Sequence, residues 1–242
     1  MTQNIYDTPE FFHGYSQLNR SVYGLAGAPE WPSLQALLPE LAGRAVADLG
    51  CGYGWFCRWA REAGARSALG LDVSEKMLAR AAAMTADEAI EYRRQDLETL
   101  QLPPAAFDLV YSSLTLHYIE NLAGLLATCH RALKPGGRLV FSIEHPIFMA
   151  ATQPQWLQDA QGQRCWPVSG YQDEGPRVTH WLADGVIKRH RTIGTLLNLV
   201  MAAGFTLRHV EDWGPSAEQV AAMPELAEER ERPMLLLVAA QR

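Results

Sequence analysis

Three acidic residues, each at the end of a strand-like segment, are the first candidates for chemistry in this sequence. Asp48 closes the run AVAD, Asp72 closes ALGLD, and Asp96 follows IEYRRQ. In open α/β sheets the carboxyl ends of the strands form the edge at which ligands bind. Carboxylates there can accept hydrogen bonds from ribose hydroxyls or a ring amino group. The acids therefore indicate a nucleoside-like ligand, although a helix cap at Asp72 and a surface turn at Asp96 are the structural alternatives.

The segment GCGYG (50–54), which is separated from Asp48 by Leu49 alone, predicts a glycine-rich turn that leads into a helix. Gly50 can adopt the positive φ of a tight turn, and Gly52 lets a ligand approach the backbone. The following helix offers free N–H groups and the positive end of its dipole. Dinucleotide binders and other nucleoside binders share such turns. Asp48 would repel a pyrophosphate but tolerate an ammonium group, and Trp55 replaces the third glycine of GxGxxG, so a nicotinamide oxidoreductase is disfavoured.

Alternating strand and helix patterns must position these residues. The predicted strands are residues 44–50, 67–72, 90–96, 107–113 and 138–144, and the predicted helices are 54–64, 75–84 and 121–133. The segment LKPGGRL (133–139) predicts the end of a helix, because Pro and two glycines turn the chain into the next strand. This alternation indicates an α/β fold with a parallel sheet and helices on both faces.

The last third of the chain has a different pattern. Residues 145–191 are rich in Pro, Gly, Gln and Trp and predict a lid-like insertion. A helix ending at Gly204 follows, and then two strands with a Glu-rich helical piece between them, which indicates an antiparallel pair at the sheet edge. We expect a single domain with four parts: an N-terminal arm and first helix (1–43), a ligand-binding core (44–144), the insertion (145–191) and the C-terminal helix and strand pair (192–242).

Composition excludes several classes of protein. The 242 residues are 48% hydrophobic and 20% charged, with a net charge of −6, which disfavours nucleic acid as a partner. The basic cluster IKRHR (187–191) is interpreted as a solvated surface turn. No apolar run approaches the roughly 20 residues of a membrane span, and the first residues do not have a signal-peptide pattern. The four cysteines form no CxxC pair, so we expect reduced thiols, no metal site and a cytoplasmic location.

Four segments together resemble the class I S-adenosylmethionine-dependent methyltransferases, a similarity that covers about residues 44–146. They are VADLGCGYG, GLDVSEKMLARA, QDLETLQLPPAAFDLVYSSLTLHYIEN and LKPGGRLVFSIEHP. Within that family the sequence is most similar to small-molecule enzymes such as those of ubiquinone and menaquinone biosynthesis. The resemblance implies a Rossmann-like, doubly wound, seven-stranded sheet of order 3-2-1-4-5-7-6, with strand 7 antiparallel, and S-adenosyl-L-methionine as cofactor.

The resemblance also implies roles for individual residues. Asp48, Gly50, Cys51 and Gly52 would surround the methionine part of the cofactor, and Ser112 or Ser113 would lie near its amino group. Asp72 would hold the ribose. Val73 and Met77 would contact the adenine, and Asp96 and Leu97 would bind its edge. Tyr15 and Arg20, from the N-terminal arm, are the candidates for the methionine carboxylate.

Two histidines are the candidate catalytic residues. His117 follows the fourth predicted strand and His145 follows the fifth, so both would lie at the ligand-binding edge. A histidine there could take a proton from a phenol or a ring N–H, because its pKa lies near working pH. The alternative is that both only line the pocket. Aromatic residues of the arm and insertion could stack on a flat acceptor or could form a separate hydrophobic cluster: Phe11, Phe12, Tyr15, Trp156, Trp166, Tyr171 and Trp181.

The expected function is therefore methyl transfer from S-adenosyl-L-methionine to an N or O atom of a small, aromatic or heterocyclic metabolite, by a monomer or homodimer. Two alternatives remain. An RNA or tRNA base methyltransferase would need a basic face and, for exocyclic amines, a Pro-Pro-aromatic motif where this chain has SSLT (112–115). A non-catalytic module that only binds the cofactor is also compatible with the sequence, because methyl transfer requires no particular catalytic side chain.

Overall fold

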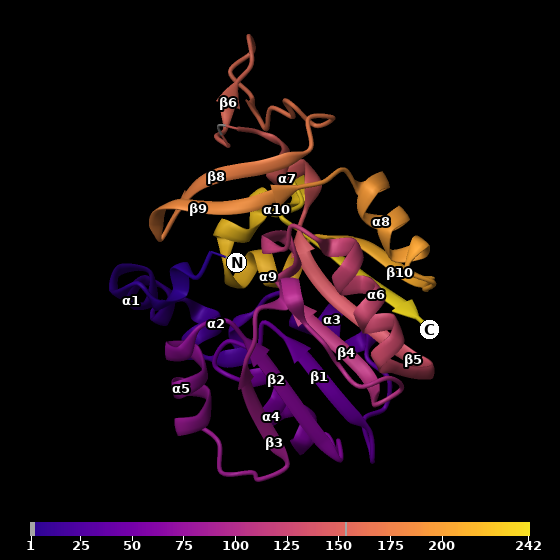
Figure 1. The fold of residues 1–242 in the computed structure, drawn as a ribbon. Helices are drawn as coiled ribbons and strands as arrows, with labels where there is room; N and C mark the ends of the chain where they lie inside the picture. The colour runs from indigo at the N-terminus through magenta and orange to yellow at the C-terminus, as the bar shows by residue number, and fades with distance from the viewer. Residues whose placement is uncertain (1–2, 153) are drawn as a thin grey trace.

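The centre of the structure is a seven-stranded sheet (Figure 1). It comes from a computed structural model that describes residues 3–152 and 154–242. The strand order is β10-β11-β5-β4-β1-β2-β3, and β11 is antiparallel to both neighbours, which confirms the predicted topology. The strands are β1 (Ala45–Leu49), β2 (Ser67–Asp72), β3 (Ile90–Arg94), β4 (Phe107–Ser113), β5 (Leu133–Glu144), β10 (Thr206–Trp213) and β11 (Leu235–Gln241).

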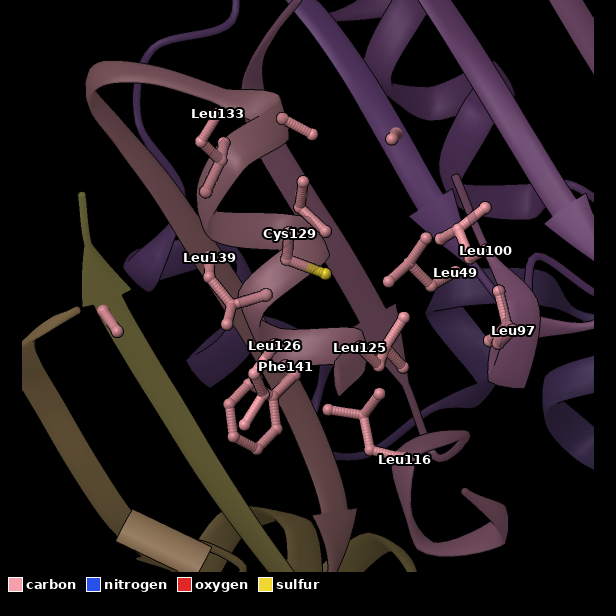
Figure 2. Close-up of a cluster of buried hydrophobic side chains, with 14 of the residues drawn as sticks. Leu49, Leu97, Leu100, Leu116, Leu125, Leu126, Cys129, Leu133, Leu139 and Phe141 are labelled. Carbon is pink, nitrogen blue, oxygen red and sulfur yellow. The ribbon is translucent and has the colours of Figure 1, made fainter. Parts of the chain in front are cut away.

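Helices cover both faces of this sheet. One face carries α3 (Trp31–Leu37), α4 (Trp55–Glu62) and α5 (Glu75–Ala83), and the other carries α6 (Leu122–Ala132) and α8 (Ile193–Ala202). In β1, Ala47 and Leu49 face the α6 side, and Val46 faces the α4 side. Figure 2 shows the α6 side, where Cys129 and its neighbours pack on β5. Because both faces are covered, the central strands are apolar at successive positions.

Strand β5 begins at Leu133, five positions before the predicted start at 138. The helix does end at Ala132, as LKPGGRL predicted, but the Pro-Gly-Gly segment already belongs to the strand. Its backbone is paired, because Gly136 N donates to Arg242 O and Arg242 N donates to Gly137 O. Pairing with a residue more than a hundred positions away is not visible in the local sequence, and it overrides the turn signal.

Two segments outside the regular frame cover the carboxyl ends of the strands. The N-terminal arm comprises η1 (Ile5–Asp7), α1 (Pro9–Ser16), α2 (Asn19–Val22) and η2 (Gly24–Gly27). The insertion comprises α7 (Pro146–Ala150), β6 (Leu157–Gln158), β7 (Arg164–Cys165), β8 (Gly175–Trp181) and β9 (Ala183–His190). In Figure 1 the β8–β9 hairpin lies across the end of the sheet, beside the N-terminus. Gln3 joins the two segments, because its side chain bonds Gly185 O and Ile187 N.

The interpretation of IKRHR as a solvated turn was wrong. Residues 187–190 form the second half of β9 (Ala183–His190), in which Val186, Lys188 and His190 are buried on one face. The period-two pattern was present in the sequence, but a lysine and a histidine at inward positions hid it.

Short elements complete the chain. They are η3 (Leu97–Thr99), η4 (Leu116–Tyr118), α9 (Ala217–Ala222), η5 (Pro224–Ala227) and α10 (Glu228–Glu231). In the described parts of the chain, no helix has the length and apolarity needed to cross a membrane. All four cysteines are free thiols.

Candidate functional site

A cavity of about 760 Å³ lies at the carboxyl ends of β1, β2, β4 and β5, under the arm and the hairpin. It brings together predicted residues from the arm, from the strand ends and following segments of β1, β2, β3 and β4, and from the start of α5. They are Tyr15, Arg20, Gly50, Gly52, Asp72, Val73, Met77, Asp96, Leu97 and His117. A volume of this size is typical of a small-molecule site, for which the usual range is about 300–1,000 Å³.

The turn after β1 needs glycine at position 50 for two reasons. Gly50 has φ +78°, and a Cβ there would lie 2.0 Å from Thr115 Oγ1. The N–H groups of Gly50 and Cys51 both donate to Leu71 O, at 2.7 and 3.0 Å. These bonds fix the turn to β2, so its position does not depend on a bound ligand.

Asp72 is held by backbone donors on both sides. Its carboxylate accepts from Gly52 N at 2.9 Å and from Ser74 N at 2.9 Å, so it links the glycine turn to the start of α5. Ser74 caps α5 by accepting from Met77 N. Burial raises the pKa of Asp72, and the backbone hydrogen bonds oppose that shift. The carboxylate lines the cavity and is available to hydroxyl donors there.

Asp48 is buried directly beneath the turn. Its main described partner is the Cys57 thiol, with Sγ 3.7 Å from Oδ2. Burial raises the pKa of Asp48 to about 8. With Cys51 it lines an adjoining cavity of about 90 Å³, which also touches Tyr15, Arg20 and Gly52. A buried carboxylate without a basic partner favours a cationic ligand group.

The arm is fixed over this site by Asp7. Its carboxylate accepts from Ser74 Oγ at 2.6 Å and from Lys76 N at 3.1 Å, at the N-terminus of α5. These hydrogen bonds lower the pKa of Asp7 although burial opposes them. The arm thereby brings Tyr15 and Arg20 to the cavity. Arg20 forms a 3.0 Å ion pair with Glu30, which is 1% exposed.

The other half of the predicted cofactor set follows β2 and β3. Asp96 caps η3 by accepting from Glu98 N at 3.1 Å, and Leu97 is buried beside it. Val73 and Met77 line the same part of the cavity. Asp96 thus caps a short helix and also faces the cavity, whereas Asp72 faces the cavity and leaves the cap of α5 to Ser74.

Ser112 and His145 do not line the cavity. Ser112 is buried and donates to Leu49 O at 2.8 Å, and Ser113 lines the cavity in its place. His145 is fully buried and caps α7, because its Nδ1 accepts from Ile147 N at 3.0 Å. Its Nε2 therefore carries the proton and donates to Asp212 at 2.7 Å. With both nitrogens engaged, the geometry gives His145 a structural role instead of the predicted base role.

His117 lies at the cavity wall and is 2% exposed. Burial, assisted by the Lys188 charge, lowers its pKa well below the usual value. Its Nδ1 accepts from Glu144 N at 3.5 Å. The neutral ring therefore carries its proton on Nε2 and acts there as a hydrogen-bond donor.

The sequence did not reveal the second set of polar residues at the cavity. Glu144, the last residue of β5, and Lys188 of β9 form a buried ion pair of 2.5 Å. Lys188 Nζ also lies 5.0 Å from the centre of the Trp181 ring. Arg177 of β8 is buried as well. Glu144 stood beside the predicted His145, and the inward periodicity of 186, 188 and 190 was the signal that could have found Lys188.

Comparison with known proteins places this site in a family. A family model described as a methyltransferase domain matches residues 47–141. The crystal structure of an S-adenosylmethionine dependent methyltransferase from Mesorhizobium loti superposes on this chain with a TM-score of 0.88. The two sequences are 58% identical, and the match covers 90% of this chain and 100% of that one. This chain belongs to the S-adenosylmethionine-dependent methyltransferases.

Curated relatives match this methyltransferase to different extents. An uncharacterized protein of Haemophilus influenzae is 32% identical over 99% of this chain and 97% of its own length. A malonyl-[acyl-carrier protein] O-methyltransferase of Pectobacterium atrosepticum is 38% identical, but only over 45% of this chain and 42% of its own length. The match to the enzyme with a named substrate is thus confined to part of the methyltransferase.

The residues of this methyltransferase fit the cofactor that the family implies. S-adenosyl-L-methionine carries a sulfonium, an amino group and a ribose, and the two adjoining cavities offer the carboxylates of Asp48, which is buried, and Asp72, which is half-buried. Arg20 supplies a cation near them from the arm, where a methionine carboxylate can bind. Within residues 3–152 and 154–242, no group of His, Cys, Asp or Glu is arranged to hold a metal ion.

Proposed function

We propose that this methyltransferase moves a methyl group from S-adenosyl-L-methionine to an N or O atom of a small, aromatic or heterocyclic metabolite. The observation that supports this best is one continuous cavity with two chemically different parts, a cofactor end and an acceptor end. Asp72 and the glycine turn line the first part, and Tyr118 and Trp181, beside the pair of Glu144 and Lys188, line the second. The arm and hairpin cover both ends, which favours a small acceptor over a macromolecule.

In this proposal each predicted residue of the cofactor end has one task. Asp72 accepts from the ribose hydroxyls, and Asp96, Leu97, Val73 and Met77 hold the adenine. The methionine part is bound by Asp48, Gly50, Cys51, Gly52, Tyr15 and Arg20, with Ser113 in the place first given to Ser112. The cofactor supplies an electrophilic methyl group. The protein aligns the acceptor with it and excludes water.

A proton acceptor is not required from the protein if the attacking atom of the acceptor is already deprotonated. His117 donates from Nε2, and the nitrogens of His145 are both engaged, so neither is placed to act as a base. The net charge of −6 disfavours RNA, which needs clustered basic residues on the surface. The malonyl-carrier relatives suggest O-methylation, but the match to the Pectobacterium enzyme covers only 45% of this chain.

Calorimetry with S-adenosylhomocysteine and NAD tests the cofactor, and we expect binding of the first alone. Release of S-adenosylhomocysteine in a screen of small aromatic and heterocyclic compounds then tests the acceptor. Unfractionated tRNA serves as the competing arm of the screen. If tRNA is methylated and no small acceptor is, the protein is an RNA methyltransferase and this proposal is wrong. Tight cofactor binding without any turnover would favour the non-catalytic module.

A further inference from the structure

The acceptor end of the cavity contains a buried ammonium that is not fully used. Lys188 is 3% exposed and donates to Glu144 Oε1. An ammonium has three N–H donors. Among the described residues, Glu144 is its hydrogen-bond partner, and the Trp181 ring adds a cation–π contact. Two donors therefore remain for a ligand in the cavity that Lys188 lines.

A second donor lines the same part of the cavity. His117 Nδ1 accepts from the backbone of Glu144, so its proton lies on Nε2. No residue that the structure describes forms a hydrogen bond with Nε2. Glu144 holds both groups, since its side chain pairs with Lys188 and its N–H bonds His117. The two residues thus present N–H donors and no acceptor.

The surrounding charges favour an anion. The charges of Glu144 and Lys188 balance, but Arg177 adds a buried cation at the cavity wall. Its guanidinium donates to the backbone oxygens of Ala150, Gly170 and Asp173, and in the described chain no carboxylate pairs with it. The opposing Glu225 is exposed at the rim, where water screens it.

We infer that Lys188 and His117 bind an oxygen anion of the acceptor, a carboxylate or a phenolate, beside the aromatic wall formed by Tyr118 and Trp181. This inference rests on the proposed function and narrows its acceptor class. Glu144 Oε2 has no hydrogen-bond partner among the described residues, but the charge of this carboxylate is already balanced by Lys188. A cationic amine would therefore meet the uncompensated charge of Arg177, so it is the disfavoured class.

Matched aromatic probes test this on protein saturated with S-adenosylhomocysteine. Benzoate and ionised 4-nitrophenol supply the two anions, benzamide is a neutral analogue, and benzylamine is a cation. By calorimetry, we expect the better anion to bind about 10- to 100-fold more tightly than benzamide, the range of a charged hydrogen bond. The anion that binds more tightly distinguishes a carboxylate from a phenolate site.

The decisive variant is Lys188→Met combined with Glu144→Gln, which removes the ion pair without leaving one charge buried alone. We expect this variant to bind S-adenosylhomocysteine normally and to lose the preference for the anion over benzamide. Arg189→Met is the control, because Arg189 is on the same strand but pairs with Glu120 outside the cavity. His117→Phe should reduce anion binding while sparing the cofactor.

Three results would overturn the inference. With the cofactor-loaded wild type, these are benzylamine binding as tightly as either anion, and no binding of the anions at all. The third is an unchanged anion preference in the double variant. Failure of the proposed function would be seen separately, as an absence of S-adenosylhomocysteine binding before any probe is added.

Discussion

The two ends of the cavity are built in different ways. At the cofactor end, backbone groups of the sheet and its turns hold the polar side chains: Asp72 is bonded by Gly52 N and Ser74 N. At the acceptor end, side chains from segments far apart in sequence hold one another, as in the pair of Glu144 and Lys188. The first kind of geometry follows from the fold, and the second depends on particular distant pairs.

The contacts between Arg232 and the aromatic residues of the insertion also depend on residues that are far apart in the sequence. The guanidinium of Arg232 lies 4.8 Å from the Phe148 ring and 4.5 Å from the Trp166 ring, and it pairs with Glu229 at 2.8 Å. Trp156 adds a third ring at 5.5 Å. One cation from the C-terminal region thus holds the aromatic residues of the insertion. We call the central sheet with its glycine turn the frame, and the N-terminal arm with the insertion the cover. Changes in the frame should abolish cofactor binding, whereas changes in the cover should alter acceptor binding.

The largest effect is expected from Gly50→Ala. Its Cβ would collide with Thr115 Oγ1 at 2.0 Å, so the turn must move and S-adenosylhomocysteine affinity should fall by more than about 100-fold. Gly185→Ala is a matched control, since Gly185 also has φ +78° but has no atom within 4 Å of a Cβ. It should cost only about 1 kcal/mol of stability. Equal cofactor affinity in both variants would contradict the distinction between frame and cover.

Next in size is Asp72→Ala. The loss of a half-buried charged acceptor should weaken S-adenosylhomocysteine binding by about 1–3 kcal/mol, as measured by calorimetry. Asp108→Ala provides the comparison at the opposite edge of the sheet, where Asp108 pairs with Lys134 at 2.7 Å. That variant should lose thermal stability and keep its cofactor affinity. Unchanged affinity in Asp72→Ala would remove Asp72 from the site.

His145→Ala should lower stability more than function. It removes the cap on α7 and the hydrogen bond to Asp212. Together these contribute about 1–2 kcal/mol to the free energy of unfolding. Chemical denaturation measures that loss, and His145→Asn should recover part of it because Asn can cap a helix. With an acceptor from the screen, kcat should change by less than about threefold. A collapse of kcat with normal stability would restore the base role predicted from the sequence.

Arg232→Lys should loosen the insertion and leave the frame intact. Lysine keeps the charge but loses the planar contact with the aromatic rings, each worth about 0.5–1 kcal/mol. Backbone hydrogen exchange in residues 156–166 should accelerate by about tenfold, while exchange in β1 stays the same. Arg230→Lys, at an exposed position nearby, is the control. If hydrogen exchange accelerates in β1 as well, the insertion and the central sheet are not independent, and the distinction between frame and cover is wrong.

The same division explains what the sequence could predict. The parallel sheet, the glycine turn and the position of Asp72 at a strand end follow from local patterns, because apolar runs, turn residues and strand ends are adjacent in the chain. The order of the strands came from the resemblance to the methyltransferase family. The period-two pattern of residues 186, 188 and 190 could place Lys188 on the inward face of a strand, but not beside its partner Glu144, which lies 44 positions away. The hydrogen bonding of His145 depends in the same way on a distant residue. Its position after β5 was correct, but its partner Asp212 comes from β10.

The smallest expected effect is a pH dependence of cofactor binding that comes from Asp48. Its pKa rises from 3.8 to about 8 in the fold because of burial, so the native state holds a proton that the unfolded chain has lost. The stability of the cofactor-free protein should therefore fall as pH rises from about 4 to about 8. The titratable side chains around the carboxyl are Cys51, Cys57, Asp72 and Tyr111, and none of them is basic.

A cationic cofactor should reverse that trend, because it favours the ionised carboxylate. Affinity for S-adenosyl-L-methionine should rise by roughly three- to tenfold between about pH 5.5 and about pH 7, an interval in which the α-amino group of the cofactor stays protonated, as measured by calorimetry. Asp48→Asn cannot ionise, so its affinity should be nearly independent of pH over this interval. Cys57→Ala is the control, since it removes the thiol partner and keeps the carboxyl that titrates. An equal slope in wild type and Asp48→Asn would mean that the proton is released elsewhere, and the frame would then act on the cofactor through shape and hydrogen bonds alone.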